Sequence, residues 1–233
     1  MTGTGLVRDV RRLTSVPAPW VLLTLALGVS ASATVGLATV GSAPSSAAAL
    51  SALPAACGVI GAVTVGADFR FGCVHSELLA VGGRLAYVAG TTRAVALFTG
   101  ATGALSAVVA LLVAGLPTAP GTGLDTPQRL LLAAVAVAVT WGVLGAAVAL
   151  LAGSQTSAVG VLLGYLVLAE PLLEATSSAA GQLLPGAVSA TVLASQGWAS
   201  VGGGALRLVL LCVLALAVAA AAMFRRAVAV TSS

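Results

Sequence analysis

Residues 66–93, GADFRFGCVHSELLAVGGRLAYVAGTTR, concentrate charge inside a chain that is otherwise apolar. No charged residue occurs at positions 13–67 before this segment or at 94–124 after it. A charged stretch between two such runs is typical of a loop that joins two membrane-spanning helices. Five of the chain's sixteen charged residues lie here, so this segment is the surface best suited to meet a soluble partner. Its charged residues are Asp68, Arg70, Glu77, Arg84 and Arg93.

The composition of the whole chain agrees with a membrane protein. Of its 233 residues, 59% are hydrophobic and 7% are charged, and the mean hydropathy is +1.13. An ordinary soluble domain has roughly 25% charged residues. The hydrophobic content comes from Ala, Val, Leu and Gly more than from aromatic residues, and small side chains of this kind let membrane helices approach closely.

Apolar runs predict an all-α integral membrane protein that forms one transmembrane domain over 1–233. A membrane-spanning helix needs roughly 20 apolar residues. The expected spans are 20–40, 47–67, 94–116, 130–151, 157–173 and 206–224, with 68–93 as a loop between the second and third.

Two further segments are expected to be helical without crossing the bilayer. Residues 6–14 place Leu6, Val10 and Leu13 on one face and basic residues on the others, which favours a short amphipathic helix in the membrane interface. A disordered basic tail is the alternative there, because so short a helix is marginal by itself. Residues 174–204 are too apolar for a solvated loop and too polar for a span, so a re-entrant or surface-lying helical segment is expected.

Arginine positions predict the orientation. With six spans, both termini and the 68–93 loop share one side of the membrane. That side holds eight arginines and the other holds two, Arg129 and Arg207. Because basic residues favour the cytoplasmic side, we expect a multi-pass protein of the cell membrane with both termini in the cytoplasm.

The chain has no motif for catalysis or for binding ATP. It contains no lysine, so it cannot form the glycine-rich phosphate loop that ends in Lys-Ser or Lys-Thr. Its single histidine, His75, has no companion ligands at metal-site spacing, and a metal site is not expected. We therefore expect a chain that is not an enzyme, and any source of work must come from another polypeptide.

Glu170 is the only candidate for an ionisable residue at mid-depth in a span, and it lies toward the outer face. It precedes Pro171, so one interpretation places it at the level of the lipid headgroups, before a proline that ends the fifth helix. The alternative is that it lines an outward-facing opening. Gly160 and Gly164 form a GxxxG pattern in the same span, which supports helix packing only weakly in a chain this rich in glycine.

The loop sequence resembles the first cytosolic loop of type-2 ATP-binding cassette permeases. The resemblance lies in the run GADFRFGCV at 66–74, in Leu78 and Leu79, and in Arg84. It extends to EPLL at 170–173 and LPGA at 184–187, in the same order along the chain. Cys73 stands where the family commonly has Thr, and Gly82 stands near a position where Pro is common.

This resemblance implies a mechanism and a set of partners. Members of that family work as dimers of six-span units, here with an identical or homologous second permease, and two separate ATPase subunits bind the ATP and Mg²⁺. The first cytosolic loop forms a coupling helix that rests on the ATPase. The implied contact residues are Asp68, Phe69, Arg70, Phe71, Gly72, Glu77, Leu79 and Arg84, and those of an outer gate or translocation path are Glu170, Pro171 and Pro185.

The leading hypothesis is thus the permease subunit of an exporter for an amphipathic, drug-like or lipid-like cargo, with no nucleic-acid partner. A second hypothesis is a membrane scaffold or sensor that transports nothing and recruits a cytosolic protein through residues 68–84. A third is an ion-coupled carrier in which Glu170 titrates. The loop charges are also compatible with an ordinary solvated loop.

Overall fold

The computed structural model describes Thr24 and residues 50–81, 83–113, 125–176, 184–194 and 198–231. The expected interfacial helix at 6–14 lies outside these residues. So does the expected span at 20–40, apart from Thr24, which is helical. The described elements are α4 (Leu53–Arg70), α5 (Val74–Val81), α6 (Arg84–Val113), α7 (Asp125–Ala152), α8 (Gln155–Gly164), the π-helical η1 (Tyr165–Ala169), α9 (Glu170–Thr176), α11 (Pro185–Ala194) and α12 (Trp198–Thr231).

The expectation of an all-helical fold is confirmed for this part of the chain, and its long apolar helices are compatible with a membrane protein. Five helices are long and apolar enough to cross a membrane. They correspond to α4, α6, α7, the continuous helix formed by α8, η1 and α9, and α12. The shorter apolar helix α11 falls within the segment expected to be re-entrant or surface-lying.

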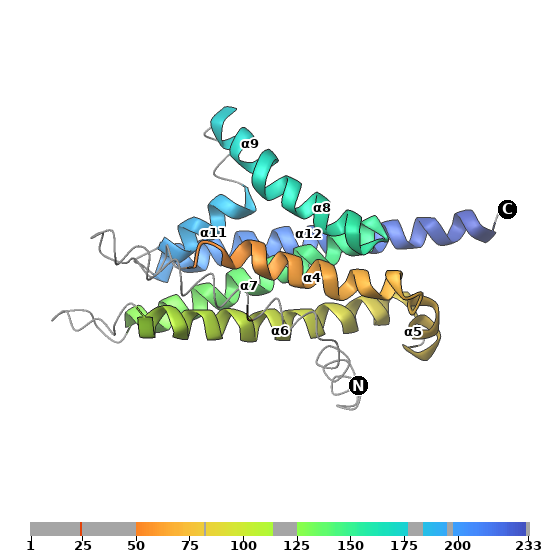
Figure 1. Ribbon diagram of the computed structural model, residues 1–233, viewed down its shortest axis with the longest axis horizontal. Coiled ribbons are helices and arrows are strands. Elements are labelled where there is room, and N and C mark those ends of the chain that lie inside the picture. The colour runs from red at the N-terminus through yellow and green to blue at the C-terminus, as the bar shows by residue number, and fades with distance from the viewer. Residues whose placement is uncertain are drawn as a thin grey trace.

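Helix α7 is the centre of the bundle. It packs against α4, α6, α8, α11 and α12. Figure 1 shows α4, α6, α7 and α12 running lengthwise together, with α5 at one end. The helix that begins with α8 leans away from the others, so that α9 lies apart from the bundle, and α11 returns toward it.

Glycines set the closest helix contact, between α4 and α7. A Cβ atom on Gly61 would fall on the carbonyl oxygen of Gly142, and a Cβ atom on Gly145 would fall on that of Gly58. Each helix therefore presents bare backbone to the other at this crossing. Such close approach increases van der Waals contact, the main attraction between helices in a lipid environment.

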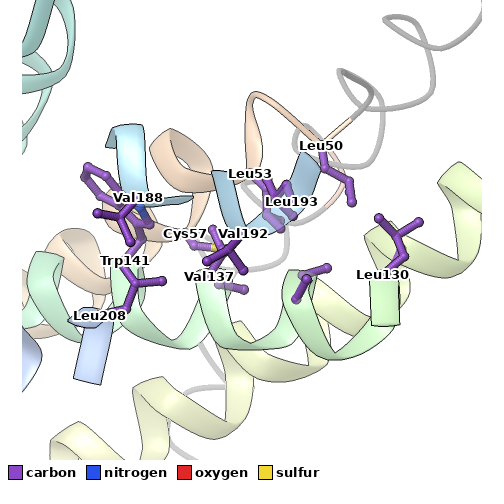
Figure 2. Close-up of a cluster of buried hydrophobic side chains, with 14 of the residues drawn as sticks. Leu50, Leu53, Cys57, Leu130, Val137, Trp141, Val188, Val192, Leu193 and Leu208 are labelled. Carbon is purple, nitrogen blue, oxygen red and sulfur yellow. The ribbon is translucent and has the colours of Figure 1, made fainter. Parts of the chain in front are cut away.

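Buried apolar side chains form two clusters, one toward each end of the bundle. Figure 2 shows the first, in which Trp141 and Val137 of α7 lie with Cys57 of α4, Val188 of α11 and Leu208 of α12. The second cluster lies nearer α5. It includes Val65, Tyr87, Val95, Leu150 and Ala219.

Large exposed apolar side chains cover the outside of the bundle. On a soluble protein such a surface would favour aggregation. On a membrane protein it meets the hydrocarbon of the bilayer. Examples along α6, the α8–α9 helix and α12 are Leu97, Leu112, Val161, Val167, Leu168, Leu172, Leu206, Leu210 and Leu214.

Several boundaries differ from the expected ones. Helix α6 begins at Arg84 rather than at 94, and α12 begins at Trp198 rather than at 206. Pro171 does not end its helix, because α9 continues to Thr176. The π-helical turn directly before it explains this: the N–H of Glu170 bonds to the carbonyl of Tyr165, five residues earlier. A wider turn gives the proline ring room against the carbonyl four residues before it.

Candidate functional site

Helix α4 ends in a tight turn that sets the direction of the chain into α5. The N–H of Cys73 donates to the carbonyl of Asp68 at 2.9 Å. The N–H of Gly72 donates to the carbonyl of Phe69 at 3.3 Å, and Gly72 has a φ of +67°. This pair of bonds with a left-handed glycine is the Schellman motif of helix termini. Gly72, expected among the contact residues, therefore has a backbone role in the turn.

Asp68 faces inward rather than toward a partner. Its side chain is 6% exposed, and its Oδ2 accepts a hydrogen bond of 2.8 Å from the hydroxyl of Tyr87. Tyr87 lies in the first turns of α6 and is itself buried. A buried carboxylate is costly unless it is hydrogen-bonded, so this bond stabilises the pairing of the two helices. The end of α4 and the start of α6 are thereby held together on either side of α5.

Helix α5 presents one apolar side to the protein and another to the outside. Leu78 packs against the second buried cluster, as does Phe69 at the end of α4. Leu79 is 85% exposed and Phe71 is 69% exposed. Within the turn, the hydroxyl of Ser76 donates to the carbonyl of Cys73 at 2.9 Å. Phe69, expected at the contact surface, is half-buried against the second buried cluster.

The charged residues of this region take up different positions. Arg70 is exposed, and its guanidinium lies 5.7 Å from the centroid of the Phe71 ring, within range of a cation–π interaction. Arg84 is half-buried at the first position of α6. Glu77 lies on α5. We define the α5 surface as the exposed side chains Arg70, Phe71 and Leu79.

The other group of predicted residues lies at the opposite end of the bundle, around α11. Glu170 is 6% exposed, and its Oε1 accepts a hydrogen bond of 3.0 Å from the N–H of Ala187, in the first turn of α11. A carboxylate in this place satisfies a backbone donor that has no partner within the helix, and it complements the helix dipole. Glu170 thus anchors the first turn of α11.

The three residues expected at an outer gate are only partly brought together. Pro185 is the first residue of α11 and lies two positions before Ala187, whose N–H donates to Glu170. Proline suits this position because the first helical N–H has no partner within the helix. Pro171 is exposed on α9. The GxxxG pair, Gly160 and Gly164, faces open space, so it makes no helix contact within the described chain.

A second buried bond fixes α11 to the centre of the bundle. The indole Nε1 of Trp141 donates to the hydroxyl of Ser189 at 2.9 Å, and that hydroxyl donates to the carbonyl of Pro185 at 2.6 Å. Sequence reasoning did not find the partners Trp141, Ser189 and Tyr87. Trp141 and Ser189 are 48 positions apart, and Asp68 and Tyr87 are 19 apart, so no local pattern links them.

The described residues contain no group of three or more His, Cys, Asp and Glu side chains that could hold a metal ion. Comparison of the chain with models of protein families, with curated proteins and with solved structures finds no match. A functional proposal must therefore be supported by the sequence and geometry of the chain itself.

Proposed function

We propose that this chain is the membrane-spanning permease subunit of an exporter driven by a separate ATPase of the ATP-binding cassette type. The α5 surface carries the proposal. A membrane protein gains nothing by exposing Leu79 on a short helix, and Phe71 in the turn before it, unless those side chains meet another molecule. Large apolar anchors beside an arginine are typical of the energetically important centre of a protein interface.

The way α5 is attached suits the transmission of force. The Schellman turn joins it to α4, and the bond between Asp68 and Tyr87 joins α4 to α6. Both long helices pack on α7, which also contacts α11 at the far end. A push on α5 would therefore move α4 and α6 together, and the glycine crossing would pass that motion to α7 with little loss.

In this proposal the partners divide the work. Two ATPase subunits bind ATP and Mg²⁺ and close around the bound nucleotide, each pressing on one α5 surface. A second permease protomer, identical or homologous, completes the path, and the cargo is an amphipathic, drug-like or lipid-like molecule. Arg70, Phe71 and Leu79 make the contact, with Glu77 and Arg84 setting its register, while Asp68, Phe69 and Gly72 hold it in shape.

The contact is tested by truncating exposed leucines at opposite ends of the bundle. Leu79→Ala should weaken retention of the ATPase in mild detergent roughly tenfold, since an interface anchor is worth more than about 1 kcal/mol. Leu112→Ala, a matched change at the other end of α6, should leave retention unchanged. Equal retention in both variants, or a purified active carrier without any ATPase, would count against the proposal.

Charge reversal separates transport from simple recruitment. Arg70→Glu together with Glu77→Arg should leave ATP hydrolysis by the assembled complex measurable but abolish ATP-driven accumulation of a lipophilic dye in inverted membrane vesicles. A scaffold that recruits a cytosolic protein predicts no dye accumulation even by the unaltered complex. The unaltered complex is therefore the decisive control.

A further inference from the structure

A cavity of about 360 Å³ opens at the end of the bundle opposite α5. Three segments far apart in sequence build it: the start of α4, the π-helical turn η1, and α11. Figure 1 shows α11 beside the beginning of α4, away from α5. The lining residues are Ser51, Pro54, Ala55, Leu166, Gly186, Ala190, Leu193 and Ala194.

The cavity has an apolar interior and one polar side chain, that of Ser51. Pro54 and Leu193 are buried, whereas Ser51, Ala190 and Ala194 are exposed and mark the opening. Pockets for small molecules have this character: mostly apolar walls with a few polar groups. Their volumes begin at roughly 300 Å³, so this cavity is of sufficient size.

The cavity walls are held in place by hydrogen bonds that involve no residue of the α5 surface. Glu170 fixes the first turn of α11 to α9, and Ser189 fixes α11 to Trp141 of α7. Leu193 belongs to the first buried cluster, shown in Figure 2, together with Leu53 at the start of α4. The wall formed by α11 is therefore anchored on both sides.

The π-helical turn η1 determines which of its side chains lines the third wall of the cavity. Leu166 is half-buried and lines the cavity, while the next two residues, Val167 and Leu168, are 67% and 64% exposed on the outer face. A π turn shifts the register of the residues after it relative to those before it, and such turns occur frequently at functional sites. The same turn that admits Pro171 thus borders the cavity.

We infer that this cavity binds the apolar part of an amphipathic molecule, a hydrocarbon chain or small ring system, with its polar end at the opening beside Ser51. An apolar cavity of about 150 Å³ accommodates one benzene molecule, so this one has room for roughly two rings or a chain of about eight carbons. The identification of this molecule as the exported cargo rests on the proposed function. The inference that the cavity binds such a molecule does not rest on it.

Photolabelling tests the inference on the purified full-length chain in phosphatidylcholine nanodiscs. The probe is an eight-carbon alcohol that carries an aliphatic diazirine, and labelled peptides are located by mass spectrometry. Labelling is expected to concentrate on residues 51–55 and 190–194, to saturate, and to fall at least fivefold with excess 1-octanol. Ala190→Phe, which fills the cavity, should reduce it to the same extent. Ala217→Phe, a matched change on the exposed face of α12, should not.

Ala55→Leu provides a second filled cavity in case Ala190→Phe does not fold, and thermal unfolding checks both variants. Labelling spread evenly over the lipid-facing helices would overturn the inference. So would equal labelling of the cavity by a phosphatidylcholine with the diazirine in its acyl chain, because the site would then hold bilayer lipid.

If labelling is selective but no ATPase binds the α5 surface, the proposed function fails while the binding site stands. If the ATPase binds and labelling is unselective, only the site fails.

Discussion

At the scale of single residues, Gly72 and Asp68 are each needed near α5 for a different physical reason. Gly72 supplies a left-handed backbone that ordinary residues adopt only at a cost, and Asp68 supplies a buried acceptor for Tyr87. Gly72 has no side chain, and the side chain of Asp68 is buried. Both nevertheless determine where the exposed side chains of Phe71 and Leu79 stand, so their substitution should disturb stability and partner binding together.

Gly72→Ala should lower the free energy of unfolding by about 1–2 kcal/mol, since a Cβ atom is unfavourable in the left-handed region. Open space surrounds Gly72, so the loss comes from the backbone and not from a clash. Thermal unfolding in detergent measures it. Gly160→Ala is the control, because Gly160 also faces open space but lies within α8, where alanine is the better helix former. An equal loss in both variants would contradict the turn's role.

Tyr87→Phe should cost about 1–3 kcal/mol, because it leaves the buried Asp68 carboxylate without its hydroxyl donor. A double-mutant cycle with Asp68→Asn measures the interaction directly. We expect the two changes to be non-additive by at least about 0.5 kcal/mol, as for residues in direct contact. Additive effects would show that the bond does not hold α4 to α6.

At the scale of helices, hydropathy and charge predicted most elements, and local pattern failed where distant parts of the chain meet. The apolar runs gave α4, α6, α7 and the helix through Glu170, and the charged segment marked the position of α5. The α4–α7 crossing could not be predicted, because its glycines are a few among 28 and the GxxxG pair that stood out faces open space. The expected fifth span ended at 173, and its continuation to Thr176 was not predicted, because a proline normally ends a helix unless a wider turn precedes it.

In the candidate site too, local sequence features were predicted and contacts between distant residues were not. The residues of the α5 surface were found because charge and aromatic side chains are conspicuous in an apolar chain. The inward position of Asp68 and Phe69 was not predicted, because a sequence gives the type of each residue but not the residues it contacts. Glu170 was singled out as an ionisable group in a span, yet its role depends on an N–H 17 positions later, in a helix whose own start is marked only by a proline.

Substitutions of Glu170 distinguish a helix-capping role from ion coupling. Glu170→Gln keeps an oxygen acceptor for the N–H of Ala187, so stability and flux should stay close to those of the unaltered protein. Glu170→Ala removes the acceptor and should cost about 1–2 kcal/mol in thermal unfolding, the usual range for loss of a helix cap. Loss of flux in Glu170→Gln with unchanged stability would instead support a carboxylate that titrates during transport.

At the scale of the whole molecule, the two ends of the bundle have different chemistry. One end carries the exposed Phe71, Leu79 and Arg70 on and beside a short helix, and the other encloses an apolar cavity beside α11. Helices α4 and α7 run between them and meet at bare backbone. This arrangement suits a chain that receives work at one end and handles an apolar molecule at the other.

The most direct test of this account is site-specific photo-crosslinking in intact cells, with a benzophenone amino acid at position 79 and, as control, at position 112. The probe replacing Leu79 is expected to capture a protein with a glycine-rich phosphate loop, and the probe replacing Leu112 is not. If no nucleotide-hydrolysing protein is captured at position 79, or if that position reacts only with reagents added outside the cell, the account is contradicted.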